Sequence, residues 1–144
     1  MGKAKKIAVA VAYWLLSCTW GILSTLVGAI MALVALCLKG KPERNGPTAI
    51  IRIGRGWGGV SIGPFALCSE DSGEHTKRHE FGHSLQNCIM GPFWPIIVGV
   101  PSAIRYWVFK FRSRRGLPNP DYDSVWFEGT ASAWGDWFIG RWDA

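Results

Sequence analysis

The chain begins with its longest apolar stretch. From Ile7 to Leu38 no residue is charged, and lysines flank both ends of this run. A continuous helix over these 32 residues would be about 48 Å long, which exceeds the ~30 Å hydrocarbon core of a bilayer. Two membrane topologies therefore fit the pattern: one long tilted helix, or a helical hairpin that breaks near Thr19-Trp20-Gly21.

The charges around the apolar run favour the hairpin, because positively charged flanks stay on the cytoplasmic side of a membrane. The run is too long for a cleaved signal peptide, and no small-residue cleavage site follows it. We therefore expect residues 1–39 to form a membrane-inserted helical segment. We expect the rest of the chain to lie on the cytoplasmic side.

Polar and strand-forming segments follow the apolar run. Residues 40–47 are polar and indicate a linker. Thr48–Gly54 and Gly59–Leu67 have the character of strands, and the glycine-rich segment Arg55-Gly56-Trp57-Gly58 between them predicts a hairpin turn. These glycines match no phosphate- or dinucleotide-binding pattern. We therefore expect one domain over residues 48–144, with a short sheet at its start.

Two helices are expected after these strands. Thr76–Met90 starts at an N-cap residue, and Gly91-Pro92 supplies a glycine stop followed by a residue that cannot continue a helix. The second helix is expected to be capped by Asp123 or Ser124. With the short sheet, these helices predict an α+β fold.

The segment between the two helices, Pro92–Phe109, is apolar but contains three prolines and Arg105. Such a segment is a poor membrane-spanning helix. It fits a re-entrant or interfacial segment, and a buried loop-helix of the core is the alternative. The basic stretch Lys110–Arg115 that follows suits anionic lipid headgroups.

Charge and composition restrict the partners. Lys and Arg outnumber Asp and Glu by 16 to 10, and the chain has nine tryptophans. The basic residues cluster beside apolar stretches, which is typical of membrane proteins, and no nucleic-acid-binding motif is present. The four cysteines form no Cys-x-x-Cys pair and are expected to be small buried apolar side chains. The partners indicated are membrane lipid and no nucleic acid, and the sequence sets no oligomeric state.

The chemistry is concentrated in His79-Glu80-Phe81-Gly82-His83. Residues four apart lie on one face of a helix, so His79 and His83 can bind one metal ion. This is the His-Glu-x-x-His pattern of zinc hydrolases. Glu80 would lie beside the metal, where it can act as general base. The sequence therefore predicts a zinc site.

A catalytic zinc site needs a third protein ligand. Glu128 is the best downstream candidate, because it shares a helix face with Ser132 and Gly135, whose small side chains permit close packing against the histidine helix. A solvent-facing glutamate on an amphipathic helix is the alternative. Asp121 is a second candidate, because Asn119-Pro120-Asp121 resembles the element that binds zinc in site-2 intramembrane proteases.

These motifs resemble the gluzincin metallopeptidases, the thermolysin-type zinc clan. They also resemble a group of small bacterial membrane proteins that share a tryptophan-glycine apolar helix, a His-Glu-Tyr/Phe-Gly-His-x-x-Gln helix and a terminal Glu-x-x-Ala helix. The matching pieces are Trp20-Gly21, His79–Gln86, and Glu128 with Ala131. The resemblance implies a bacterial inner-membrane protein with His79, His83 and Glu128 as zinc ligands and Glu80 as general base.

One position departs from this pattern. Gluzincins often carry an aspartate four residues after the ligand glutamate, hydrogen-bonded to a zinc-binding histidine. Ser132 occupies that position here, and Asp136 is one turn further on. A hydroxyl can still accept the imidazole N–H but brings no charge.

The sequence as a whole predicts a membrane-anchored zinc metallopeptidase that hydrolyses peptide or protein substrates. Tyr122 is the candidate donor to the oxyanion, with Arg141 as a second candidate. The edge of the strand Gly59–Leu67 is the candidate for holding extended peptide. The alternatives are a non-catalytic membrane protein in which zinc joins two helices, and a site-2-like protease that uses Asp121.

Overall fold

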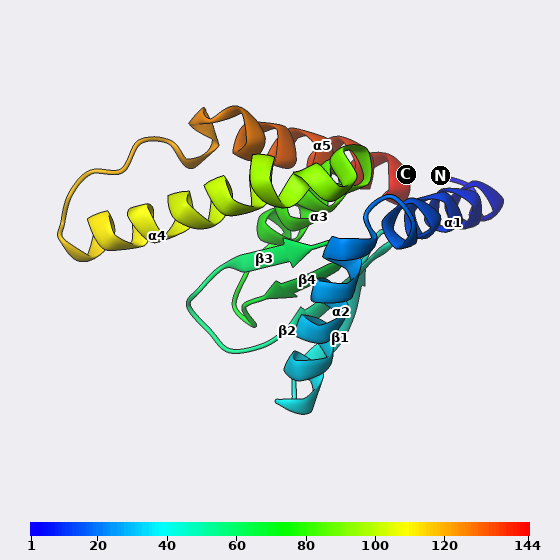
Figure 1. Ribbon diagram of the computed structural model, residues 1–144, viewed down its shortest axis with the longest axis horizontal. Helices are drawn as coiled ribbons and strands as arrows, with labels where there is room; N and C mark the ends of the chain where they lie inside the picture. The colour runs from blue at the N-terminus through cyan, green and yellow to red at the C-terminus, as the bar shows by residue number, and fades with distance from the viewer.

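Two helices open the chain, a four-stranded sheet follows, and three further helices complete the α+β fold (Figure 1). The computed structural model describes all 144 residues. Its helices and strands, in chain order, are α1 (Lys3–Cys18), α2 (Ile22–Cys37), β1 (Lys41–Asn45), β2 (Thr48–Arg52), β3 (Gly59–Ile62), β4 (Phe65–Cys68), α3 (Glu74–Met90), α4 (Val100–Arg114) and α5 (Trp126–Asp143). Short helical turns precede α4 (η1, Gly91–Phe93; η2, Pro95–Gly99) and α5 (η3, Tyr122–Ser124).

The sheet has the order β1-β2-β4-β3, in which only β2 and β4 are parallel. The predicted hairpin between Thr48–Gly54 and Gly59–Leu67 is therefore wrong. Gly63, with a φ of 61°, and Pro64 turn the second segment back on itself, so that it forms both β3 and β4. The loop with Arg55-Gly56-Trp57-Gly58 crosses to the far edge of the sheet instead of closing a tight turn. As a result, β3 is an edge strand.

The predicted linker, residues 40–47, contains strand β1, which pairs with β2. Its charges suggested a linker, but charged side chains are also typical of an edge strand. Glu43 of β1 forms ion pairs with Arg52 at 2.5 Å and with the buried Lys77 at 2.8 Å. The Arg52 guanidinium also donates to the carbonyls of the loop before α3. These contacts fix β1 against the start of α3.

The sheet lies between α2 and α3. Side chains alternate along each strand, so Ile51 packs with Ala32 and Ala35 of α2, whereas Ile50, Ala66 and Cys68 form a second small cluster. On the α2 side there is no room for a side chain at Gly28, where a Cβ would overlap the carbonyl of Ile62. Both sheet faces are therefore covered by helices.

The apolar run is divided into α1 and α2 at the predicted break, with a bend of 100° between the two helices. The chain here is neither one straight helix nor an antiparallel hairpin. Neither helix alone has the length and hydropathy of a membrane span, and the two together pass that test only as a bent pair. Tyr13 of α1 packs against Phe81 and hydrogen-bonds to Thr48 and Ser84, so α1 contributes to the core.

The predicted helix boundaries need small corrections. α3 begins at Glu74 after Gly73, two residues before Thr76, and it ends before Gly91 as expected. Asp123 and Ser124 belong to η3 and do not cap α5, which begins at Trp126.

The segment Pro92–Phe109 forms η1, η2 and the first two-thirds of α4. No residue of α4 is buried, so the prediction of a buried core helix is wrong for it. In Figure 1, α4 and α2 cross the side of the molecule that faces the viewer.

Candidate metal centre

Three predicted ligands converge between α3 and α5. The Nε2 atoms of His79 and His83 lie 3.0 and 3.2 Å from the same carboxylate oxygen, Oε2 of Glu128. All three residues are buried, and Glu128 is fully so. Ligand atoms of the three lie within 4.8 Å of one another. This buried group could hold a metal ion.

Glycines bring the two helices close enough for this convergence. A Cβ at Gly82 would overlap the backbone carbonyl of Ala131, and a Cβ at Gly135 would overlap that of Arg78. Any larger residue would therefore push α5 away from α3. Gly82 lies between the two histidines in sequence, and its role is to admit the helix that carries Glu128.

The second nitrogen of each imidazole is also engaged. Nδ1 of His79 lies 2.8 Å from the Ser132 hydroxyl, as expected from its position. Nδ1 of His83 lies 2.8 Å from Oε1 of Gln86. The Gln86 amide nitrogen donates to the Phe127 carbonyl and to the Thr130 hydroxyl, both at 2.7 Å, and this fixes which end of the amide faces His83.

The role of Gln86 was not predicted from the sequence. Its position three residues after His83 places it on the same helix face, and this spacing was the available signal. Because an amide oxygen only accepts hydrogen bonds, Nδ1 of His83 must donate. The other nitrogen, Nε2, is then directed at Glu128 and is free to bind a metal ion.

The residues present fit zinc. Burial lowers the pKa of His83, but its hydrogen bond to Glu128 and the charges of Glu80 and Glu128 outweigh burial and raise the pKa, so a proton on Nε2 lies between the nitrogen and the carboxylate. A zinc ion could take the place of that proton, because deprotonated Nε2 then offers its lone pair to the metal. The two Nε2 atoms lie 3.0 and 3.2 Å from Oε2 of Glu128, close to the roughly 3.3 Å that would separate two ligand atoms of one tetrahedral zinc ion. Two imidazoles with one carboxylate are a donor set that suits zinc better than calcium or magnesium.

The carboxylate of Glu128 is held in its charged form. Burial raises the pKa of Glu128, but hydrogen bonds from His79 and His83 outweigh it and lower the pKa to about 2. Its second oxygen, Oε1, is buried without a hydrogen-bond partner. A buried, ionised carboxylate with an unpartnered oxygen needs a cation beside it.

Glu80 lies on the sheet side of the centre. Its carboxylate packs against the backbone of Gly59 in β3, where a Cβ would overlap it. Burial raises the pKa of Glu80, against the opposing effect of the two imidazoles. The pKa values of Glu80 and Glu128 are thus shifted in opposite directions, which is a pattern that separates a proton carrier from a permanently charged group.

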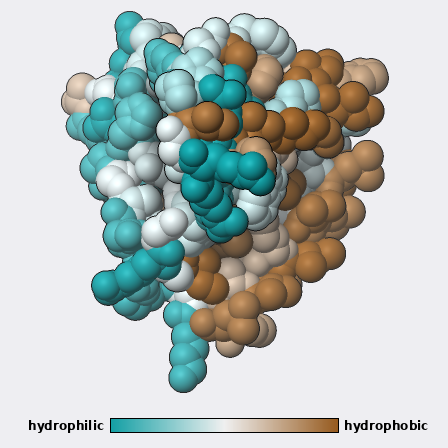
Figure 2. Space-filling view, turned by 90° about the vertical axis from the view of Figure 1, so that its left-hand side faces the viewer, coloured by the Kyte–Doolittle hydropathy of each residue, from teal (hydrophilic) through white to brown (hydrophobic).

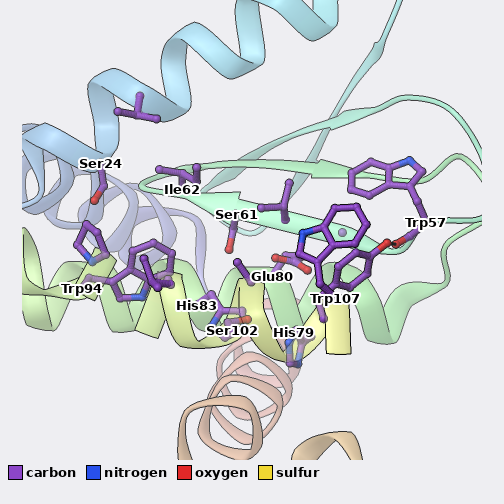
Figure 3. Close-up of a pocket in the computed structure, with 18 of the residues that line it drawn as sticks. Ser24, Trp57, Ser61, Ile62, His79, Glu80, His83, Trp94, Ser102 and Trp107 are labelled. Carbon is purple, nitrogen blue, oxygen red and sulfur yellow. Dashed lines mark hydrogen bonds between the residues drawn. The ribbon is translucent and has the colours of Figure 1, made fainter. Parts of the chain in front are cut away.

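A cavity of about 670 Å³ adjoins the histidines and Glu80. Its walls are strand β3, the N-terminal half of α2, and the segment from Trp94 to Lys110 of α4, with Tyr122 completing the lining. Figure 3 shows Glu80 and His83 below Ser61 of β3, with Trp107 and Trp57 on one side and Trp94 on the other. The candidate metal centre is therefore open to a ligand of substantial size.

Tyr122 lies at the edge of this cavity, and its ring centroid is 6.1 Å from that of His79. Burial raises the pKa of its hydroxyl, so it remains a proton donor at neutral pH. Arg105 of α4 holds the Tyr122 backbone carbonyl through Nε and Nη2, at 3.0 and 2.9 Å. Arg105 therefore fixes the loop that presents Tyr122.

Three other candidates lie elsewhere. Arg141 is exposed in the last turn of α5 and stacks on Trp137, so the prediction of a second oxyanion donor there is wrong. The carboxylate of Asp121 is exposed and accepts from the backbone of Asp123, and it does not belong to the group of possible metal ligands. Asp136 pairs with Arg78 at 3.5 Å and makes no contact with a histidine.

Comparison of the chain with protein-family models, with curated proteins and with solved structures gave no match. The site therefore has to be interpreted from its own geometry.

Proposed function

We propose that this chain is a zinc-dependent peptidase anchored to a membrane. The observation that carries the proposal is the direction of the imidazoles. Ser132 and Gln86 engage both Nδ1 atoms, and both Nε2 atoms point at one oxygen of the buried Glu128. This leaves a three-ligand set with an adjoining cavity. Structural zinc sites usually have four protein ligands, so a set of three favours catalysis.

His79, His83 and Glu128 would hold the zinc ion. When bound, zinc supplies Lewis acidity, which polarises a carbonyl group and acidifies water. Glu80 takes the proton from the attacking water at its carboxylate and passes it to the leaving nitrogen. Its raised pKa suits both steps, because the group must accept and then release a proton near neutral pH.

The substrate proposed is a peptide in extended conformation. β3 pairs only with β4, so its outer edge offers unpaired backbone groups, and its residues line the cavity beside Glu80. An extended peptide can add to such an edge as a further strand. The Tyr122 hydroxyl is the proposed donor to the carbonyl oxygen as charge develops on it.

A non-catalytic metal site is the second candidate, because the three ligands join α3 to α5 and a metal there would hold the two helices together. This alternative leaves Glu80 without a role, although its carboxylate lies in the cavity beside the histidines. Glu80 is therefore the residue that separates the two functions.

The test uses detergent-purified protein, metal analysis by mass spectrometry, and hydrolysis of a pool of quenched fluorescent peptides. Wild type is expected to hold about one zinc per chain, since one set of ligands is present. His83→Ala should lose the metal, and Glu80→Gln should keep the metal and lose hydrolysis. His75→Ala is the matched control, because His75 is an exposed histidine on the same helix. Equal hydrolysis by wild type and Glu80→Gln would contradict the proposed mechanism.

A further inference from the structure

One side of the molecule is apolar. Figure 2 shows hydrophobic residues gathered on its right-hand side and hydrophilic residues on the left. That apolar side is the one that faces the viewer in Figure 1, where α2 lies in front of the sheet and α4 runs above it. We call it the apolar face and define it by six exposed residues of α2, η2 and α4, namely Leu23, Val27, Ile30, Ile96, Val100 and Trp107.

The mouth of the cavity opens through the apolar face. Four of its six residues, Leu23, Val27, Val100 and Trp107, also line the cavity next to His79 and Glu80. Each of the four is more than half exposed. Exposure of this apolar rim to water costs free energy, and large contiguous apolar patches on proteins normally mark a surface that a partner or a membrane covers.

Charge at the perimeter indicates what covers this face. Seven of the sixteen basic residues lie at the outer ends of the three helices: Lys3, Lys5 and Lys6 at the start of α1, Lys39 after α2, and Arg112, Arg114 and Arg115 at the end of α4. In Figure 1 these ends point outward in three directions around the face. An apolar centre with a basic perimeter is complementary to hydrocarbon surrounded by anionic headgroups.

The dimensions favour one leaflet of a bilayer. α1 and α2 have 16 residues each, which corresponds to about 24 Å and is less than the ~30 Å hydrocarbon core. They meet at 100°, so they cannot cross a bilayer together along its normal. In Figure 1 the three helices run across the view, α1 toward the right, α2 toward the bottom and α4 toward the left. Helices in this arrangement lie in the plane of the interface.

We infer that the apolar face is embedded in a single leaflet and that the cavity opens into the lipid, so the site receives apolar peptide segments that already reside in the membrane. The substrate class rests on the proposed function, whereas the embedding does not. A peptide would leave the lipid past Val27 and Val100 and meet the edge of β3. The apolar rim favours such segments over charged peptides from water.

The test places one fluorophore at a time on the full-length chain. Cys18 and Cys37 are exposed, so the expectation that all four cysteines are buried is wrong for these two, and both are first replaced by serine. Single cysteines are then introduced as Val27→Cys and Ala103→Cys at the mouth, and as Gly73→Cys in a polar exposed loop where a side chain meets nothing. Each is labelled with a polarity-sensitive dye and reconstituted into vesicles of phosphatidylcholine and phosphatidylglycerol.

The two mouth labels are expected to shift to blue emission, to be quenched by a nitroxide near the lipid headgroup more than by one at the chain end, and to lose quenching by aqueous iodide. The Gly73 label should behave in the opposite way. The same results are expected after zinc is removed with a chelator. Mouth labels quenched by iodide as strongly as the Gly73 label would overturn the inference. Mouth labels shielded only in cross-linked dimers would also overturn it, by assigning the face to a second copy of the chain.

These readings do not depend on metal or hydrolysis. Lipid-quenched mouth labels in a protein that binds no zinc would contradict the proposed function and keep the embedded face. Zinc-dependent hydrolysis with water-exposed mouth labels would support the proposed function and contradict the embedded face.

Discussion

At the scale of single residues, the candidate centre combines three possible metal ligands with a hydrogen bond to each imidazole. The histidine pair and Glu80 could be predicted from a five-residue spacing, because a helix places residues four apart on one face. Glu128 could be predicted as the third ligand because Ser132 and Gly135, which share its helix face, have small side chains. Gln86 could not, because its function depends on an amide orientation set by Phe127 and Thr130 of another helix.

Removing either of these hydrogen bonds should weaken metal binding. Ser132→Ala and Gln86→Ala each leave one imidazole free to rotate, and we expect zinc affinity to fall about 10- to 100-fold. Ser132→Asp should retain the affinity of wild type or exceed it, because a carboxylate accepts the same N–H more strongly. Competition with a zinc-chelating dye measures each constant. Unchanged affinity in both alanine variants would mean that the imidazoles are oriented by packing alone.

At the scale of elements, the contact between α3 and α5 decides whether the ligands meet. Gly82→Ala places a methyl group against the Ala131 carbonyl. We expect it to destabilise the fold by about 1–3 kcal/mol through overpacking and to reduce zinc binding. Gly140→Ala, on α5 with open space around it, is the matched control. It should stabilise the fold by about 0.5–1 kcal/mol. Thermal unfolding in detergent measures both, and a Gly82→Ala protein as stable as wild type would contradict the close contact.

The ion pairs around Glu43 connect the sheet to α3 and have a defined pH dependence. Hydrogen bonding by Lys77 lowers the pKa of Glu43 below its usual value of 4.5. Its contribution to stability is therefore present above pH 4.5 and is lost as the pH falls through the lowered pKa. Burial lowers the pKa of Lys77, but its hydrogen bonds with Glu43 and Glu74 outweigh burial and raise the pKa above 10.5. The contribution of Lys77 to stability is therefore complete below pH 10.5 and is lost as the pH rises through the raised pKa.

Glu43→Gln should therefore lower the unfolding temperature at neutral pH and make the loss of stability below pH 4.5 shallower. Glu70→Gln is a control at the more solvent-exposed pair Lys41–Glu70, where screening by water makes a smaller change expected. A pH series of unfolding temperatures checks both. An acid limb of equal steepness in wild type and Glu43→Gln would contradict the role of the network.

At the scale of the whole molecule, the sequence predicted the fold class but not how its parts are joined. The division of Gly59–Leu67 into two strands depends on a turn at Gly63, and the pairing of β4 with β2 is a long-range contact without a local signal. The linker became a strand because Glu43 finds partners in β2 and α3. The break at Thr19-Trp20-Gly21 could be predicted from the apolar run. The angle between α1 and α2 could not, because it depends on the packing of α1 against α3 and of α2 against the sheet.

At the same scale, the inferred embedding of the apolar face makes a prediction about binding to lipid vesicles. Burial of the apolar face does not depend on ionic strength, whereas attraction through the basic perimeter is screened by salt. Protein bound to vesicles of phosphatidylcholine and phosphatidylglycerol should therefore remain bound after a high-salt wash.

Replacing Arg112, Arg114 and Arg115 by glutamine should slow binding and reduce the preference for anionic lipid, with retention after the wash unchanged. Replacing Val27 and Ile30 by glutamate should remove retention after the wash and keep the preference for anionic lipid. Two buried carboxylates oppose insertion, whereas the basic perimeter stays intact. Sedimentation of vesicles with bound protein measures both, and release of wild type by salt alone would make the basic perimeter, and not the apolar face, the membrane anchor.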